Sequence, residues 1–119
     1  MSIQRIGTTA RYSDIVIHNG SAWIVEVPAS EGTDAGTQTQ EILASLDRLL
    51  AQAGSGRDRL LMATIYLTDL SDYDAMNTVW DAWLPAGTAP SRACVQVAGL
   101  ARAGWRVEIA VVAAVGKSV

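Results

Sequence analysis

The sequence predicts an α+β domain with a mixed sheet and two helices packed on one face, in the order βββαβαββ. Three observations predict this class: β-rich runs flank an Asn-Gly pair, two segments carry apolar residues at helical spacing, and short apolar runs lie between and after those segments. A chain of 119 residues buries enough surface for one core and seldom enough for two. We therefore expect a single domain over residues 1–119.

The first part of the chain predicts three strands. A short strand is expected at Ser2–Ile6, followed by strands at Asp14–His18 and Ser21–Val27. The Asn19-Gly20 pair between the last two is a strong signal for a two-residue type I′ hairpin. The polar segment Ala29–Gly36 contains glycine and predicts a loop.

The middle of the chain predicts two helices separated by a strand. Residues Thr37–Ala53 carry apolar side chains at helical spacing, and Gly54 favours a helix end there. Leu60–Leu67 is apolar almost throughout, which is typical of a central strand covered on both faces. Ser71 and Asp74 have the spacing of a capping box at the start of a second helix. The apolar stripe of that helix is Tyr73, Met76, Trp80 and Trp83, and Pro85 and Gly87 end it.

Two final strands are expected at Ser91–Val97 and Trp105–Val115. The connecting stretch Ala98–Gly104 contains glycine, so an antiparallel hairpin with a long loop is expected. Crossover connections through helices are right-handed, which puts both helices on one sheet face and leaves the other face bare. Because strands as apolar as these are unfavourable when exposed to solvent, we expect the bare face to pack against other copies of the chain.

Composition and charge exclude several classes of protein. Nine Lys and Arg against twelve Asp and Glu give a net charge of −3. The chain therefore lacks the excess of basic residues that is typical of a nucleic-acid-binding protein. The single cysteine, Cys94, rules out an internal disulfide, and with the single histidine, His18, it cannot form a Cys/His zinc site. The N-terminus has no apolar stretch typical of a signal peptide or membrane helix, so a reducing cytoplasmic location is expected.

Arg92 and Glu108 are the candidate catalytic pair. Arg92 shares a strand face with Cys94, and Glu108 shares one with Arg106. If the expected hairpin turns near residue 100 or 101, Arg92 and Glu108 are direct or diagonal neighbours, within about 8 Å at the backbone. A guanidinium and a carboxylate would then flank one spot. The alternative is an ordinary ion pair on a half-exposed strand face.

Other residues have simple structural interpretations from the pattern alone. Cys94 has the character of a small buried hydrophobic residue, Tyr12 of an aromatic side chain covering an edge of the core, and Asn77 of a solvent-facing helix residue. His18 ends a strand at a hairpin corner and is expected to be a turn residue. The tryptophans Trp23, Trp80, Trp83 and Trp105 are expected to be core or interface anchors.

Several separated segments resemble the Rid family of reactive intermediate deaminases. They are Ala89-Pro90-Ser91-Arg92-Ala93-Cys94-Val95-Gln96-Val97, Arg106-Val107-Glu108-Ile109 and the Ala113-Ala114-Val115 ending, together with Ala63–Asp69 and the helix containing Ala75-Met76-Asn77. The resemblance covers nearly the whole chain. It implies a chorismate-mutase-like βββαβαββ fold and a homotrimer with pockets between subunits.

The resemblance also implies an activity: hydrolysis of reactive 2-imino or 2-enamino acids, such as 2-aminoacrylate, to 2-keto acids and ammonia. This is the reaction of a 2-iminobutanoate/2-iminopropanoate-type deaminase, and it requires no cofactor or metal. Arg92 matches the arginine that holds the substrate carboxylate, and Glu108 matches the acid that positions or activates water. Tyr12, Asn77 and Cys94 match other residues of the substrate pocket.

One segment departs from the family pattern. Where well-studied relatives carry a Ser-Gly-Gln-Ile-Pro-like run after the third strand, this chain has Ile24-Val25-Glu26-Val27-Pro28, so a hydroxyl and a glycine are lost. The departure favours an alternative function, in which the chain is a non-enzymatic trimer of the same fold that binds small acids or acts like a chaperone.

Overall fold

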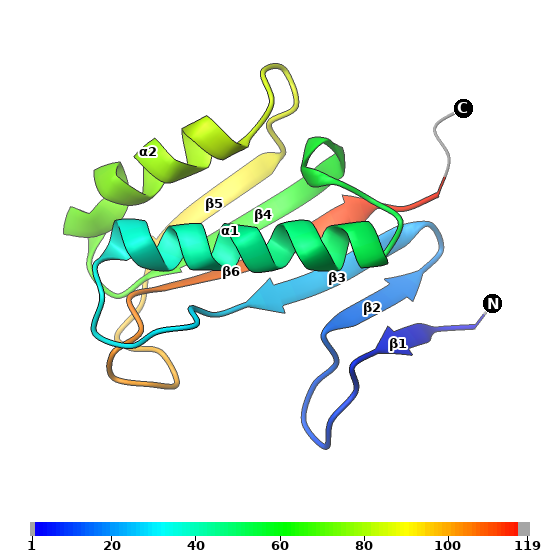
Figure 1. The fold of residues 1–119 in the computed structure, drawn as a ribbon, viewed down its shortest axis with the longest axis horizontal. Coiled ribbons are helices and arrows are strands. Elements are labelled where there is room, and N and C mark those ends of the chain that lie inside the picture. Colours follow the sequence, from blue (N-terminus) through cyan, green and yellow to red (C-terminus); the bar gives the residue numbers. More distant parts are fainter. Residues whose placement is uncertain (1, 117–119) are drawn as a thin grey trace.

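The computed structural model describes residues 2–116 and has the predicted order of strands and helices (Figure 1). Its strands are β1 (Gln4–Ile6), β2 (Ile15–His18), β3 (Ser21–Glu26), β4 (Leu60–Leu67), β5 (Ser91–Gln96) and β6 (Val107–Ala114). Its helices are α1 (Ala35–Gln52) and α2 (Tyr73–Trp83), with short 3-10 turns η1 (Arg57–Arg59) and η2 (Leu70–Asp72).

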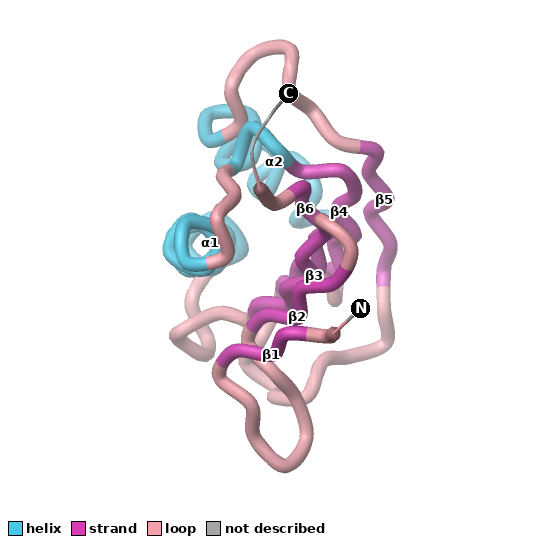
Figure 2. Tube along the Cα trace, turned by 90° about the vertical axis from the view of Figure 1, so that its right-hand side faces the viewer, coloured by secondary structure: helices cyan, strands magenta, loops and turns pink. Residues whose placement is uncertain are grey.

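The six strands form one mixed sheet in the order β1-β2-β3-β6-β4-β5, and both helices lie on the same face of it (Figure 2). Only the β4–β5 pair is parallel, and it is joined by the α2 crossover. The core between helices and sheet is made by residues such as Leu46 and Leu50 of α1 and Ile65 and Ile109 of the sheet, all fully buried. The predicted α+β architecture is therefore confirmed.

The β2–β3 hairpin turns as the Asn-Gly pair predicts. Asn19 has a φ of 51° and Gly20 a φ of 77°, and His18 pairs with Ser21 directly across the turn. Positive φ at both central residues is the requirement of a type I′ turn, which asparagine and glycine meet with the least strain. His18 lies at this corner, where its Nδ1 is 3.2 Å from the backbone oxygen of Ser2.

The predicted hairpin between the last two strands is wrong. β5 is an edge strand that pairs only with β4, whereas β6 lies between β3 and β4 and is antiparallel to both. Every second residue of β6 is buried, including Val107 and Ile109. Burial of these apolar side chains stabilises the fold most when the strand lies at the centre of the sheet. Chain neighbours usually pair, but here burial of the most apolar strand decides the order instead.

The helix starts differ from the sequence predictions. α1 begins two residues before Thr37, because the Asp34 side chain caps it by accepting a hydrogen bond from the Thr37 amide at 2.7 Å. The predicted capping box at Ser71 and Asp74 is wrong. The Asp69 carboxylate instead accepts from the Ser71 amide at 2.8 Å, which caps η2, and α2 follows directly without a side-chain cap.

A buried glutamine ties the two long loops together. Gln38, which is fully buried in α1, donates to the carbonyls of Thr33 and Gly104, and its carbonyl oxygen accepts from the Arg106 amide at 2.7 Å. Gly104 is needed at this contact because a Cβ there would lie 2.6 Å from the Cβ of Glu31. The loop before α1 is therefore fixed to the loop that leads into β6.

The sheet face opposite the helices carries exposed apolar side chains. Trp23 is 44% exposed, Val25 55% and Val95 41%, and a shallow hollow of about 100 Å³ lies between β3, β6 and β4. We call this surface the bare face. Along β4, Ala63, Ile65 and Leu67 are fully buried towards the helices, while Met62 is 36% exposed. The expectation that this strand is covered on both faces is not met within one chain.

Candidate functional site

Arg92 lies on β5 with its side chain directed towards α2. Its Nη1 donates to Asn77 Oδ1 at 2.8 Å and its Nη2 donates to the Tyr73 hydroxyl at 3.2 Å. Its Cζ lies 5.8 Å from the Tyr73 ring centroid and 5.6 Å from that of Trp80. Residues 73, 77 and 80 follow the i, i+4, i+7 spacing of one helix face, so α2 presents all three to the guanidinium.

The partners of Arg92 are all uncharged. Neither ion pair among residues 2–116 involves it, so its charge is not neutralised by a carboxylate of the described chain. An arginine has five N–H groups, and the bonds to Asn77 and Tyr73 use two of them, which leaves three. An open hollow of about 440 Å³ lies beside it, lined by Leu70, Tyr73, Arg92 and Cys94. This arrangement suits a small anion such as a carboxylate.

Cys94 lies two residues along the same strand face and lines the same hollow. Burial raises the pKa of its thiol, and the nearby Arg92 offsets this only in part. A thiol with a raised pKa stays protonated at neutral pH and is a poor nucleophile. Cys94 therefore forms part of the wall of the hollow.

Glu108 lies on the other face of the sheet. In β6 it pairs with Tyr66 of β4, whereas Arg92 pairs with Ala63 of β4 on the helix side. The alternation of β6 directs Val107 and Ile109 to the core and Glu108 to the bare face. The prediction that Arg92 and Glu108 flank one spot across a hairpin is therefore wrong within a single chain, and so is the alternative of a direct ion pair between them.

Glu108 is a half-buried carboxyl group with no ion-pair or hydrogen-bond partner for its side chain among residues 2–116. Burial raises its pKa above the ordinary value of 4.5. The cause is loss of water around the charged form, which makes the ionised carboxylate a stronger base than one in open solvent. Such a group is suited to accepting a proton from water.

Tyr12 is distant from Arg92 along the sheet. It lies in the loop between β1 and β2 and is 63% exposed. That loop is at the sheet edge opposite to β5 (Figure 1). The structure therefore brings together Arg92, Asn77 and Cys94, and it leaves Tyr12 and Glu108 elsewhere on the same chain.

Tyr73 and Trp80 belong to the site but were predicted only as core residues of the α2 stripe. Their spacing relative to Asn77 could have indicated this. Residues 73, 77 and 80 share one helix face, so they contact the same neighbouring strand. Gln96 is a further supporting residue: its Oε1 accepts from the Leu70 amide at 2.8 Å and so fixes the wall of the hollow that Leu70 forms.

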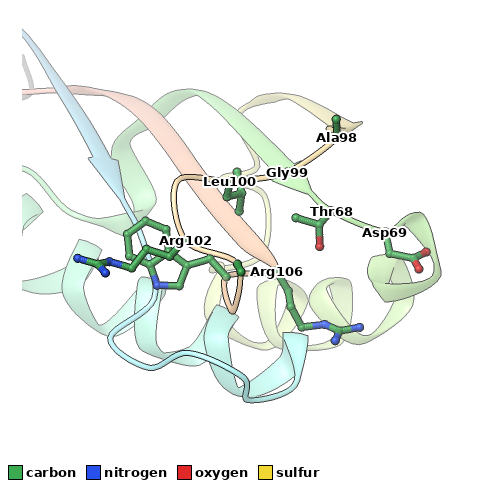
Figure 3. A pocket seen from close by; sticks show the side chains of 9 residues that line it. Thr68, Asp69, Ala98, Gly99, Leu100, Arg102 and Arg106 are labelled. Carbon is green, nitrogen blue, oxygen red and sulfur yellow. The ribbon is translucent and has the colours of Figure 1, made fainter.

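A second hollow of about 420 Å³ is enclosed by Thr68, Asp69 and the loop of residues 98–106 (Figure 3). Its two arginines are not directed at one spot. Arg106 pairs with Asp72 at 3.0 Å, and Arg102 lies over the Trp105 ring with its guanidinium directed away from Arg106 (Figure 3). No third cation lines this hollow, so it is a weaker candidate for an anion site than the one at Arg92.

Within residues 2–116, no cluster of three or more His, Cys, Asp or Glu side chains is placed to hold a metal ion. Within the same part of the chain, neither helix has the length and apolar character needed to cross a membrane.

Comparison with known proteins identifies the family. Residues 2–115 match the family described as Endoribonuclease L-PSP. The RutC family protein YoaB of Escherichia coli is 48% identical over 115 residues, which cover 97% of this chain and all of that protein. The crystal structure of NMB1025 from Neisseria meningitidis, a member of the YjgF family, superposes with a TM-score of 0.94 at 46% identity and covers 99% of this chain and 98% of that one.

A further structure connects these names. The protein YyfA of Yersinia pestis, a protein of unknown function from the conserved Rid family, superposes with a TM-score of 0.85 at 28% identity, covering 91% of this chain and 90% of that one. The segments around Arg92 and Glu108 suggested the same assignment from sequence alone. The chain belongs to the YjgF family, whose members also carry the names Rid and RutC.

Proposed function

We propose that the protein hydrolyses small 2-imino and 2-enamino acids to 2-keto acids and ammonia. The observation that carries the proposal is the Arg92 guanidinium, held by uncharged side chains beside an open hollow with three N–H groups unused. Its planar fork matches a carboxylate, and the charge persists at any physiological pH.

The chemistry needs little more than positioning and one base. Arg92 holds the substrate carboxylate, and Glu108 accepts a proton from water as the water oxygen bonds to C2. A 2-enamino acid first takes up a proton at C3 and loses one from nitrogen, which converts it to the imine. When water adds, the electron pair of the C=N bond moves to nitrogen, which takes up the proton that Glu108 accepted. The C–N bond of the resulting amino alcohol then breaks as the hydroxyl proton passes to the leaving nitrogen, which gives the keto acid and ammonia. Positioning and acid-base help of this kind account for useful accelerations.

We propose that each site is shared between copies of the chain. Arg92 faces α2 whereas Glu108 faces away from the helices, so one chain cannot aim both at a single substrate. The bare face, with Trp23 and Val25 exposed, supplies an apolar surface for association. In a homotrimer, Arg92, Asn77 and Cys94 of one chain would meet Glu108 and Tyr12 of a neighbouring chain.

The test is turnover of 2-aminoacrylate generated in place by a pyridoxal-phosphate enzyme, followed by the loss of imine absorbance. The protein should accelerate this loss well beyond the rate in buffer, with one keto acid formed for each ammonia. A rate equal to that in buffer contradicts the deaminase proposal.

A second candidate function is binding of small acids without turnover. The observation that favours it is Glu26, which stands at the end of β3 in the segment that departs from the family pattern. Glu26 places a carboxyl group in the segment that replaces the hydroxyl- and glycine-bearing run of relatives, and burial and the neighbouring Asp14 raise its pKa. Saturable binding of 2-oxobutanoate together with unaccelerated imine loss would select this function. An RNA-cleaving role has less support, because a net charge of −3 lacks a basic footprint for a phosphate backbone.

A further inference from the structure

The Tyr73 hydroxyl has a hydrogen-bonding arrangement that leaves its proton available. Its oxygen lies 3.2 Å from Arg92 Nη2. A guanidinium has N–H donors and no acceptor, so the phenol oxygen must accept in this bond. No acceptor for the Tyr73 O–H occurs among the hydrogen bonds of residues 2–116, and the side chain is 39% exposed at the hollow.

The Tyr73 hydroxyl and the Arg92 guanidinium are hydrogen-bonded to each other at the hollow. Tyr73 and Arg92 both line it, and the bond between them fixes the distance between the two sets of donors. Cys94 and Leu70 complete the lining and offer no charged group. An anion placed against the guanidinium therefore has the Tyr73 hydroxyl within reach as a second donor.

We infer that Tyr73 is a direct anchor for the acid group of the substrate, donating its hydroxyl proton to the carboxylate that Arg92 holds. This inference rests on the proposed function and adds a specificity residue to that same site. A ligand with a charged carboxylate beside C2 can accept from both residues. Its uncharged amide loses most of this interaction, so the site should discriminate between a 2-keto acid and the matching 2-keto amide.

The first test compares Tyr73→Phe with the parent protein by calorimetric titration with 2-oxobutanoate. Removing one hydrogen bond to a charged group should raise Kd about tenfold or more, while the ring packing of Tyr73 is kept. Thr78→Ala is the matched control. It removes a hydroxyl from the same helix, one that donates to the Asp74 carbonyl at 3.0 Å and lies away from the hollow lining, and Kd should not change. An unchanged Kd in a folded Tyr73→Phe variant overturns the inference.

The second test separates direct contact from an indirect effect through Arg92. In an Arg92→Lys background, Tyr73→Phe should still weaken binding several-fold, because the hydroxyl itself touches the ligand. If its effect vanishes in that background, the hydroxyl merely orients the guanidinium, and direct anchoring is wrong.

The same measurements distinguish failure of this inference from failure of the deaminase proposal. Imine turnover by the parent protein with an unchanged KM in Tyr73→Phe overturns the anchor alone. Binding of 2-oxobutanoate that Tyr73→Phe weakens, without any turnover, overturns the deaminase proposal alone. Absence of 2-oxobutanoate binding together with unaccelerated imine loss overturns both. If the parent protein turns over the imine without measurable 2-oxobutanoate binding, the KM of Tyr73→Phe decides on the anchor.

Discussion

At the scale of single residues, Arg92 is a charge surrounded by neutral partners. Asn77 and Tyr73 orient the guanidinium through hydrogen bonds without neutralising it. An arginine in an ion pair must release its carboxylate partner before it can bind a substrate carboxylate. Arg92 has no such partner to release among residues 2–116. The residue is therefore preorganised for binding.

Replacing Arg92 should remove substrate binding without unfolding the chain. We expect Arg92→Ala to lower kcat/KM for 2-aminoacrylate at least about a hundredfold, since the charged anchor is lost in both ground and transition states. Arg92→Lys should recover part of this loss, because an ammonium lacks the planar fork. Steady-state kinetics beside melting temperature measure both effects. Arg48→Ala, at an exposed arginine on α1, is the control and should leave kcat/KM unchanged. A folded, fully active Arg92→Ala variant would refute the role of Arg92.

Glu108 should impose a pH dependence on turnover. Burial raises the pKa of this carboxyl above 4.5, and only the ionised form can accept a proton from water. We expect kcat to rise as pH increases through that raised pKa and then to level off. Glu108→Gln should lower kcat by roughly 10²–10⁴-fold and abolish the acidic arm of the profile, with less effect on KM. Retention of the acidic arm in Glu108→Gln would assign the titration to another group.

At the scale of elements, the sequence predicted most of the fold and part of the site. The hairpin at Asn19-Gly20 and the amphipathic helices were readable because local chemistry decides them. The position of β6 could not be predicted from local sequence. Whether β6 pairs with β5 or lies at the centre of the sheet depends on how much apolar surface the whole sheet buries. The error in that strand order carried over to the site, because it placed Glu108 beside Arg92.

The tie between the two long loops is an element-scale feature that a mutation can test. Gln38→Ala removes all three hydrogen bonds of the buried amide and leaves the Gly104 carbonyl and the Arg106 amide without that partner. We expect a loss of about 3 kcal/mol in the free energy of unfolding, measured by urea denaturation. Gln40→Ala, on the exposed side of the same helix, should change stability little. Equal losses in the two variants would contradict a special role for Gln38.

At the scale of the whole molecule, the bare face should govern assembly. Val25 is 55% exposed there, and a lysine at this position would place a charge in an apolar interface. We expect light scattering at micromolar concentration to give the mass of the proposed trimer for the parent protein and for Gln40→Lys on α1, and the mass of a monomer for Val25→Lys. A trimer mass for Val25→Lys would mean that another surface holds the copies together, and a monomer mass for the parent protein would contradict the proposed trimer.

Mixing two inactive variants tests whether a site draws on two chains. Arg92→Ala retains Glu108, and Glu108→Gln retains Arg92. After the two are unfolded and refolded together in equal amounts, about a quarter of shared sites should regain both native residues. Activity should then recover to about that fraction, while each variant refolded alone stays inactive. No recovery in mixed trimers would place the whole site within one chain.

The central position of β6 also has a consequence for biosynthesis. β3 and β4 do not pair with each other, so the sheet stays divided until residues 107–114 have left the ribosome and inserted between them. Both strands expose unpaired backbone edges until then, and edges of this kind invite pairing with other nascent chains. The contacts that close the sheet span long stretches of sequence, which slows folding relative to chains of local topology. Until β6 inserts, the two halves of the sheet are therefore open to association with other chains.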